Sequence, residues 1–385
     1  MTLESPGTAA AFEWIETREG LLPALDLLAR EPAVGVDLEA DSLFHFQEKV
    51  CLLQLAATDR VFLVDPLAVG DLSPLAPLFA NPDVIKILHG SDYDLRSLDR
   101  DFNIRVHGLF DTQIAARFLG LDETGLGNLL ETRFGVRAEK KFQKKDWSVR
   151  PLPDEMLRYG AQDALYLVPL YRMLREELRG LGRLSWVEEE CAIQSGVRHA
   201  PPDEGPLFLR LRGAGHLDPR GLAVAEELLR FRMNLASKRD RPPFKVLGNQ
   251  AILELARRRP TTSKELASVP GVSKGLIRVL GSGLVQCIHE AMETPEGSLP
   301  VYPRKTFRRQ GSGVIKRVRA LKEWRNKRAG ELGLDPSVLL TNAQIQALAV
   351  AKPSRPGDLA PIEGIRRWQQ ESFGRALCEV TARGK

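Results

Sequence analysis

Two carboxylates one residue apart close an apolar stretch of the chain, and they are the first side chains in the sequence that could perform chemistry. In residues 33–40 (AVGVDLEA) strand-forming apolar residues alternate with others, which predicts a β-strand. Successive side chains of a strand point to opposite faces, so Asp37 and Glu39 share one face. Adjacent carboxylates in a half-buried setting repel unless a cation neutralises them, and Mg²⁺ prefers carboxylate oxygen. The pair therefore predicts a metal site, although the same tripeptide also occurs where a strand simply reaches solvent.

A second source of acids follows the predicted strand 84–88, where the tripeptide HGS passes into a helix. Asp92 and Asp94 are two residues apart and so stand about 200° apart on a helix. At most one of them can face the first pair of acids. Both flank the apolar stripe of the helix at similar angles, so periodicity does not choose between them. The alternative is purely structural, with Asp92 capping the helix and Asp94 in solvent.

A tyrosine and a fourth acid lie in a helix predicted from Pro153 to Arg179. Tyr159 and Asp163 are four residues apart, which places them on one helical face about 40° apart. An acid with a neighbouring phenol suits a metal site in which a water molecule must be both bound and oriented. As structure alone, the same pair is a half-buried tyrosine beside a surface acid.

The elements around these residues form a mixed pattern. Strands are predicted at 33–40, 50–57, 61–64 and 84–88, and helices at 12–30, 71–80, 92–101, 111–119, 126–133 and 153–179. A small mixed sheet with helices is an α/β domain, which we expect to occupy residues 1–198.

The rest of the chain is helical in pattern and contains a repeat. Four pairs of identical residues are each separated by 93 positions, namely Arg232 and Arg325, Asn249 and Asn342, Pro260 and Pro353, and Gly271 and Gly364. Chance identity would not keep one offset over so long a stretch, so the sequence predicts a duplicated helical module. We expect the copies at 214–294 and 311–385, preceded and joined by stretches rich in Pro and Gly.

Composition narrows the class of protein. The chain has 385 residues, a net charge of +5 and 43% hydrophobic residues, which indicates a soluble protein of two or three domains. Its four cysteines lie far apart with no Cys-x-x-Cys pair, so that neither a disulfide framework nor a zinc knuckle is indicated. The N-terminus is acidic where a signal peptide needs bases, and no apolar run has the length of a membrane span. We therefore expect a cytoplasmic protein that does not bind membranes.

Basic residues gather in two places that could contact nucleic acid. One is next to the tyrosine helix, where cations surround Phe142 and precede a tryptophan; the other lies between the helical copies. The residues expected to contact nucleic acid are Lys140, Lys141, Lys144, Lys145 and Trp147 in the first cluster and Arg304, Lys305, Arg308 and Arg309 in the second. Solvated faces are the alternative for both.

Taken together, these motifs resemble the ribonuclease D family of 3′ to 5′ exonucleases, whose acids follow the order Asp-x-Glu, Asp, Tyr-x-x-x-Asp. Further similar stretches are residues 64–67 (VDPL), 111–113 (DTQ) and 146–152 (DWSVRPL). The resemblance covers nearly the whole chain, since the duplicated module looks like the paired helicase-and-RNase-D C-terminal (HRDC) domains of bacterial members. It implies an RNase H-like exonuclease domain with a mixed sheet, followed by two all-α HRDC-like domains.

The resemblance also implies a mechanism and a site. The acids would be Asp37, Glu39, Asp94 and Asp163, with Asp94 favoured over Asp92 by its spacing of five from His89. They would hold two divalent ions, Mg²⁺ or Mn²⁺, while Tyr159 orients the attacking water. The expected activity is that of a monomeric exoribonuclease which trims 3′ ends of RNA such as tRNA precursors and releases nucleoside 5′-monophosphates. A DNA exonuclease that acts on single strands, or a nucleic-acid-binding module without catalysis, are the alternatives.

Overall fold

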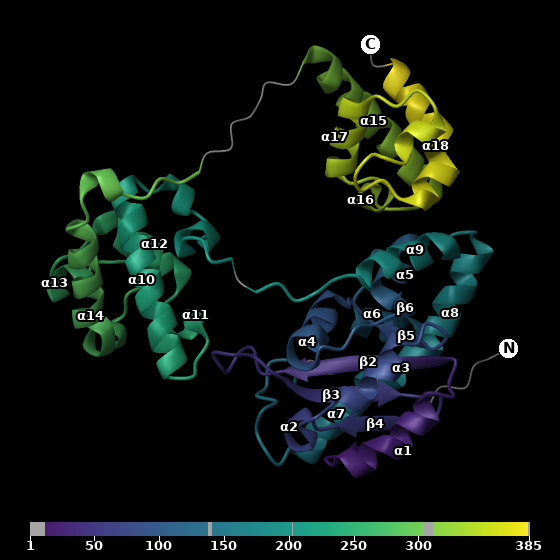
Figure 1. Cartoon of the computed structure of the whole chain (residues 1–385), viewed down its shortest axis with the longest axis horizontal. Helices are drawn as coiled ribbons and strands as arrows, with labels where there is room; N and C mark the ends of the chain where they lie inside the picture. The colour runs from purple at the N-terminus through teal and green to yellow at the C-terminus, as the bar shows by residue number, and fades with distance from the viewer. Residues whose placement is uncertain (1–11, 138–140, 202, 304–310, 384–385) are drawn as a thin grey trace. The chain divides into compact units, whose positions relative to one another are not determined.

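A six-stranded mixed sheet forms the centre of the N-terminal domain (Figure 1). The computed structural model describes residues 12–137, 141–201, 203–303 and 311–383. The strands lie in the order β1-β4-β3-β2-β5-β6, and β2 pairs antiparallel with β3 and parallel with β5. Their bounds are β1 Phe12–Ile15, β2 Ala33–Ala40, β3 Val50–Ala56, β4 Val61–Val64, β5 Ile85–Leu88 and β6 Leu109–Asp111. The sheet is therefore mixed, as the sequence predicts.

The helices of this domain follow the sequence expectation in most places. Their bounds are α1 Arg18–Leu28, α2 Pro66–Val69, α3 Ala76–Ala80, α4 Asp92–Phe102, α5 Thr112–Leu119, α6 Leu126–Phe134, α7 Asp154–Leu165, α8 Leu167–Gly180 and α9 Leu184–Gln194. A single turn of 3₁₀ helix, Ser73–Leu75, precedes α3. No helix among the described residues is both long enough and apolar enough to cross a membrane.

Three predicted helices were wrong in their extent, and the one expected at 71–80 is α-helical only over Ala76–Ala80, after the 3₁₀ turn. The start of the helix expected at 12–30 is the strand β1, because its aromatic residues pair in parallel with β4, and the helix begins only after Thr17, whose hydroxyl accepts a hydrogen bond from the amide of Gly20. The helix expected at 153–179 is divided into α7 and α8 at Tyr166. Pro169 explains the division, because a proline has no N–H to donate to the carbonyl of Leu165 four residues earlier.

The two faces of the sheet are covered differently. Val34, Val36 and Leu38 of β2 belong to the main hydrophobic core on one face. Helix α7 packs on the other face, against β2, β3 and β4. The approach is close at Gly160, where a Cβ atom would lie 2.8 Å from the side chain of Leu52. A larger residue there would push α7 away from the sheet, so this glycine sets the distance between the helix and the acidic face of β2.

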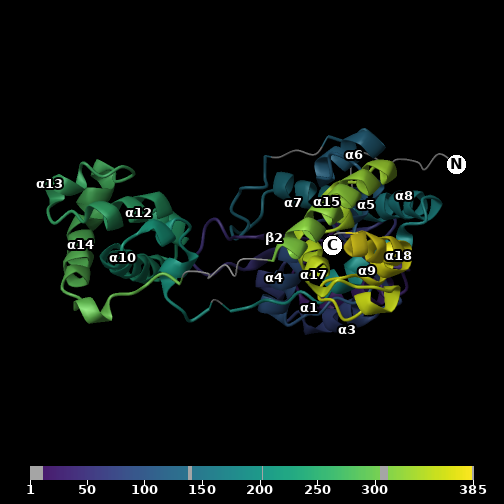
Figure 2. The ribbon, with the colours of Figure 1, turned by 90° about the horizontal axis from the view of Figure 1, so that it is seen from above.

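Two helical modules follow, and each is built around one long first helix (Figures 1 and 2). The first module contains α10 Pro219–Lys238, α11 Pro243–Val246, α12 Asn249–Arg258, α13 Ser263–Leu266 and α14 Lys274–Met292. The second contains α15 Ser312–Leu332, α16 Pro336–Leu339, α17 Asn342–Ala351 and α18 Arg367–Arg383.

The structure confirms the repeat of 93 residues at the level of single hydrogen bonds. In the first module, Arg232 donates to the carbonyl of Leu247 (3.1 Å) and to the side chain of Asn249 (2.6 Å). In the second, Arg325 makes the corresponding bonds to Leu340 (3.0 Å) and Asn342 (3.2 Å). The same arginine therefore ties the long helix to the next two helices in both copies.

The two modules differ in what they pack against. The second forms one compact unit with the N-terminal domain, and the two share a continuous hydrophobic core. Trp186 of α9 stacks on Trp368 of α18, with ring centroids 4.6 Å apart, and Arg366 pairs with Glu190 at 3.0 Å. The first module forms a unit of its own that also includes the segment Asp41–Lys49. The boundaries predicted from sequence do not express this difference.

Candidate active site

The acidic face of the sheet is built by the alternation of β2. Because Val36 and Leu38 enter the main core, Asp37 and Glu39 point to the opposite face, where α7 packs. Asp37 lies opposite Gln54 of β3, and Glu39 lies opposite Leu52. The pattern read from the sequence therefore places both carboxylates beneath the helix that carries Tyr159 and Asp163.

The third and fourth acids reach the same place from two helices. Burial and the charges of Asp163, Asp94 and Glu39 raise the pKa of Asp37 well above its usual value. Burial and the charges of Asp163 and Asp94 raise the pKa of Glu39 to about 9. Since the charges of Asp163 and Asp94 act on both strand carboxylates, the two helical acids lie near Asp37 and Glu39.

The pKa values of the two acids on helices, Asp94 and Asp163, are raised less than those of the strand acids. Burial, and then the charge of Asp111, raise the pKa of Asp94 to about 7. Burial raises the pKa of Asp163 to about 6, against the opposing effect of a hydrogen bond from the hydroxyl of Tyr159. In all four acids, burial is the largest cause of the raised pKa.

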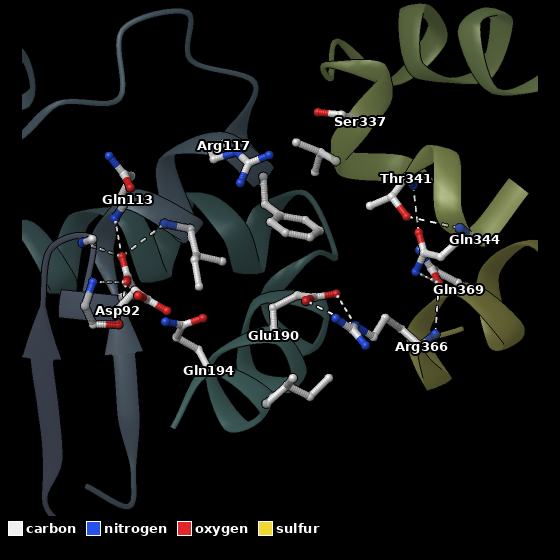
Figure 3. A pocket seen from close by; sticks show the side chains of 17 residues that line it. Asp92, Gln113, Arg117, Glu190, Gln194, Ser337, Thr341, Gln344, Arg366 and Gln369 are labelled. Carbon is white, nitrogen blue, oxygen red and sulfur yellow. Dashed lines mark hydrogen bonds and ion pairs between the residues drawn. The ribbon is translucent and has the colours of Figure 1, made fainter. Parts of the chain in front are cut away.

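Asp92 lies outside this group. Its side chain is exposed and accepts a hydrogen bond from Nε of Arg96 at 2.9 Å. It lines a pocket of about 340 Å³ between α5 and α9 and the second module (Figure 3). Glu190, also in this pocket, is paired with Arg366. None of the four clustered acids lines this pocket, so it is a separate feature.

The ring of Tyr159 packs against two other aromatic side chains. Only 7% of the residue is exposed, and its ring centroid lies 5.6 Å from that of Phe142 and 6.1 Å from that of Trp147. Burial and its hydrogen bond to Asp163 raise the pKa of the Tyr159 hydroxyl, which therefore stays protonated at neutral pH. The predicted role of Trp147 in binding nucleic acid does not fit the structure, because this side chain is fully buried and offers no face to a base.

Arg150 fixes the segment that carries Trp147. Its guanidinium forms two bonds with the carboxylate of Asp65, at 2.6 and 2.7 Å, and donates to the carbonyls of Trp147 and Cys51 at 2.7 Å each. A two-pronged arginine–carboxylate pair gives a defined geometry. The stretch 146–152 thus acts as a support for the tyrosine.

The predicted nucleic-acid contacts are only partly described. Lys141 pairs with Glu155 at 3.0 Å and lies over the ring of Phe142. Lys144 and Lys145 are exposed. Lys140 and the set Arg304, Lys305, Arg308 and Arg309 lie outside the described residues. Binding of nucleic acid by these cations stays a prediction.

Two residues near the acids have roles that the sequence pattern did not indicate. Gln54, opposite Asp37, is fully buried, and neither its amide nitrogen nor its oxygen has a partner within the described residues. Its only signal in the sequence is that it is a polar residue inside an apolar strand. Asp111 caps α5 and also accepts from the amides of Gly90 and Ser91, at 3.0 and 2.7 Å. It therefore fixes the turn from which α4, with Asp94, begins.

The donor chemistry of the site is that of carboxylate oxygen. In the part of the chain that the structure describes, no three His, Cys, Asp or Glu side chains are already arranged to hold a metal ion. Burial and the charges of Asp94 and Asp163 raise the pKa values of Asp37 and Glu39, so that full ionisation of the four acids is unfavourable without a cation. Such a set fits a hard divalent cation, which would relieve their repulsion.

The comparisons with known proteins agree with this architecture. The family model described as 3′-5′ exonuclease matches residues 12–179, and the HRDC domain model matches residues 221–288 and 315–381. A protein of Acidiphilium cryptum named Ribonuclease D is 31% identical over 366 residues, which are 94% of this chain and 90% of that protein. Its counterpart of the same name in Haemophilus influenzae is 30% identical, over 88% of this chain and 84% of its own.

Solved structures extend the similarity to three dimensions. Escherichia coli RNase D, described as an exoribonuclease involved in structured RNA processing, has a TM-score of 0.72 at 26% identity, over 97% of this chain and 99% of that chain. The catalytic core of RRP6 from Trypanosoma brucei has a TM-score of 0.65 at 29% identity, over 74% and 80% of the two chains. This chain therefore belongs to the ribonuclease D family of 3′–5′ exoribonucleases, with one exonuclease domain followed by two HRDC domains.

Proposed function

We propose that the four clustered acids hold two divalent cations, Mg²⁺ or Mn²⁺, and that the enzyme trims the 3′ ends of RNAs such as tRNA precursors to release nucleoside 5′-monophosphates. The observation that carries the proposal is that acids from β2, α4 and α7, with Asp94 buried and the other three half-buried, lie close enough for the charges of Asp94 and Asp163 to raise the pKa values of both Asp37 and Glu39. The unpartnered amide of Gln54 beside Asp37 gives the same site a further polar group for a bound water or ligand.

The acids and Tyr159 have different roles in the proposed hydrolysis. When bound, the cations would supply Lewis-acid stabilisation of the attacking and leaving oxygens in an in-line displacement. The protonated hydroxyl of Tyr159 orients the attacking water, and its raised pKa makes it a poor general base. Attack forms a bond from the water oxygen to phosphorus and breaks the bond to the 3′ oxygen, which takes up a proton. The terminal nucleotide leaves as a 5′-monophosphate.

The choice of RNA is supported by the names of the relatives. The proteins that match over most of this chain are named Ribonuclease D, and the Escherichia coli structure is described as acting in structured RNA processing. The same carboxylate chemistry would also serve DNA, and a protein distinguishes the two polymers through the 2′-hydroxyl. The nucleic acid must therefore be compared directly.

The test is digestion of 5′-labelled RNA and DNA of equal sequence by the full-length protein with Mg²⁺, with Mn²⁺ or with EDTA. We expect RNA to shorten one nucleotide at a time from the 3′ end, mononucleotides to accumulate, and EDTA to stop the reaction. Cleavage that persists in EDTA would contradict the metal assignment. Faster digestion of DNA would contradict the assignment of RNA as the substrate.

A matched pair of variants tests the site itself. Asp94→Asn and Asp92→Asn make the same chemical change two residues apart in the first turn of α4. We expect Asp94→Asn to lower kcat by at least about a hundredfold, because one ligand is removed, and Asp92→Asn to have a small effect. An inactive Asp92→Asn with an active Asp94→Asn would reverse the assignment.

A further inference from the structure

The two HRDC modules share one corner of the backbone but carry different side chains on it. The corner is the turn that follows the long first helix and leads into the short second helix, at residues 238–245 in the first module and 331–338 in the second. Asp240 and Gly333, which are 93 residues apart, both adopt a left-handed conformation there, with φ of 44° and 62°. Both turns thus contain a left-handed residue at the same position, and the side chains around it differ.

In the second module this corner packs on the exonuclease domain. The carbonyl of Leu332 accepts a hydrogen bond from Arg183 at 2.6 Å. A Cβ atom at Gly120 would collide with the carbonyl oxygen of Gly333, so the two turns lie directly against each other. Leu334, which lies near Gly120, is 6% exposed. The corner of the second module is therefore occupied within its own compact unit.

In the first module the same positions are basic and exposed. The cations Lys238, Arg239, Arg241 and Lys245, here called the basic corner, stand where the second module has Glu331, Leu332, Leu334 and Val338. All four are exposed, and within the described part of the chain none of them forms an ion pair. The acid among them, Asp240, is already bound to His45 at 2.7 Å and to the amide of Phe46 at 3.0 Å.

Aromatic rings accompany these charges. Phe244 is 54% exposed, and the equivalent residue of the second module is Ser337, which is not aromatic. The ammonium group of Lys245 lies 4.4 Å from the ring centroid of Phe44, which belongs to the Asp41–Lys49 segment. That segment follows β2 directly along the chain, two residues after Glu39. Phe44 is half-buried and Phe244 is exposed, and cations interleaved with accessible aromatic rings suit single-stranded nucleic acid.

The basic side chains of this corner are not required for the termination of α10. Basic residues at a helix C-terminus often serve only to complement the helix dipole. The second module tests this explanation, because α15 ends at the same turn with no basic residue in its last turn, whereas α10 has Lys238. The fold of the module therefore forms without them.

From this contrast we propose that the basic corner binds the phosphate backbone of the RNA substrate, and that the first HRDC module is the copy that holds RNA while the second serves as part of the exonuclease domain. This assignment rests on the proposed function, since it takes the substrate to be RNA. Four exposed cations within eight residues give the corner a local positive charge that the rest of the module does not require for folding.

The test compares two variants of the full-length protein that lose the same charge. One changes Lys238, Arg239, Arg241 and Lys245 to Ala. The control changes four other exposed cations of the compact unit that contains the first module, Arg210, Arg212, Lys264 and Lys274, to Ala. Thermal unfolding establishes that both variants fold. KM and kcat are then measured on a single-stranded RNA of about 30 nucleotides and on a tetranucleotide, and RNA binding by an inactive Asp94→Asn background is measured at several salt concentrations.

We expect the corner variant to lower the ratio of kcat/KM for the long RNA to that for the tetranucleotide by about tenfold or more. The slope of log K against log salt should become less steep by about 0.7 for each phosphate that the variant no longer neutralises. The control should keep the wild-type ratio and slope. Equal losses in both variants, or none in the corner variant, would overturn the proposal. If the corner variant loses binding and salt slope in the inactive background but the wild-type protein does not hydrolyse RNA, the proposed function fails and the binding surface stands.

Discussion

At the scale of single residues, Tyr159 is the side chain whose role differs most from that of its neighbours. Its hydroxyl donates to Asp163 and is kept protonated by burial and by the surrounding acids. The ring is packed on Phe142 and Trp147, so removing the hydroxyl alone leaves the packing intact. This separation makes the residue suitable for a conservative test.

We expect Tyr159→Phe to lower kcat roughly ten- to a thousandfold, because the attacking water loses an orienting hydrogen bond, while metal affinity and Tm stay near their wild-type values. Steady-state kinetics with Mg²⁺ and a calorimetric measurement of Mn²⁺ binding check this. Tyr171→Phe is the matched control. Tyr171 lies in α8, is half-buried and packs against Phe110 of β6. Wild-type turnover in Tyr159→Phe would remove the tyrosine from the mechanism.

Local geometry explains how much of the site the sequence could predict. Asp37 with Glu39, and Tyr159 with Asp163, are related by the periods of a strand and a helix, which depend only on spacing. The choice between Asp92 and Asp94 depends on where α4 lies, and helical periodicity left it open. Trp147 was misjudged for the same reason, because its burial beneath Tyr159 comes from tertiary packing.

At the scale of elements, the start of α4 depends on Asp111 at the end of β6. This carboxylate accepts from the amides of Gln113 (2.8 Å) and Ile114 (3.2 Å) in α5, and from the amide and the hydroxyl of Ser91 at 2.7 Å each. One buried acid thus fixes two helix starts. Asp94 lies three residues beyond Ser91, so its position follows from that clamp.

We predict that Asp111→Ala destabilises the protein by on the order of 3 kcal/mol and also lowers kcat, because a helix cap is removed and buried amides are left without an acceptor. Ser91→Ala removes only the hydroxyl bond and should cost about 1 kcal/mol. Urea unfolding followed by circular dichroism measures both. Equal stability of the two variants would show that the clamp does not hold the turn.

Sequence patterns predicted most elements and failed where a long-range pairing decides. Residues 12–15 are too few to show a strand pattern in the sequence. They form β1 because β4 offers a parallel partner. The division of α7 from α8 was in principle readable, since Pro169 cannot continue the hydrogen-bond ladder to Leu165.

At the scale of the whole molecule, the two HRDC copies differ in what they pack against. Both have the same arginine bonds and the same turns, so their sequences predict two equivalent modules. Among the described residues, it is the second copy that shares its core with the exonuclease domain, through Trp368 on Trp186 and Phe118. That difference lies in which surface each copy buries, and a repeat pattern does not report it.

We predict that Trp368→Ala lowers the stability of the exonuclease domain by about 3 to 5 kcal/mol, because a fully packed aromatic ring is removed from the shared core. Activity on a short oligonucleotide should then disappear at a lower temperature than in the wild type. Phe208→Ala is the control, since Phe208 is also 2% exposed but lies in the core of the first module. Its removal should leave the thermal inactivation of short-substrate cleavage nearly unchanged. The same shift in both variants would mean that the modules unfold together.

The shared core also sets an order of events during protein synthesis. The compact unit that contains the active site is drawn from residues 1–40, 50–200 and 308–385, with the first HRDC module made in between. Its early strands leave the ribosome long before Trp368 and Phe373, which complete their core. At the usual 5 to 20 residues per second, the 168 residues from position 200 to Trp368 (368 − 200) take roughly eight to thirty-five seconds to translate. Throughout that time the apolar surface around Trp186 stays uncovered, and α18, which is made after the first HRDC module, is the helix that closes it.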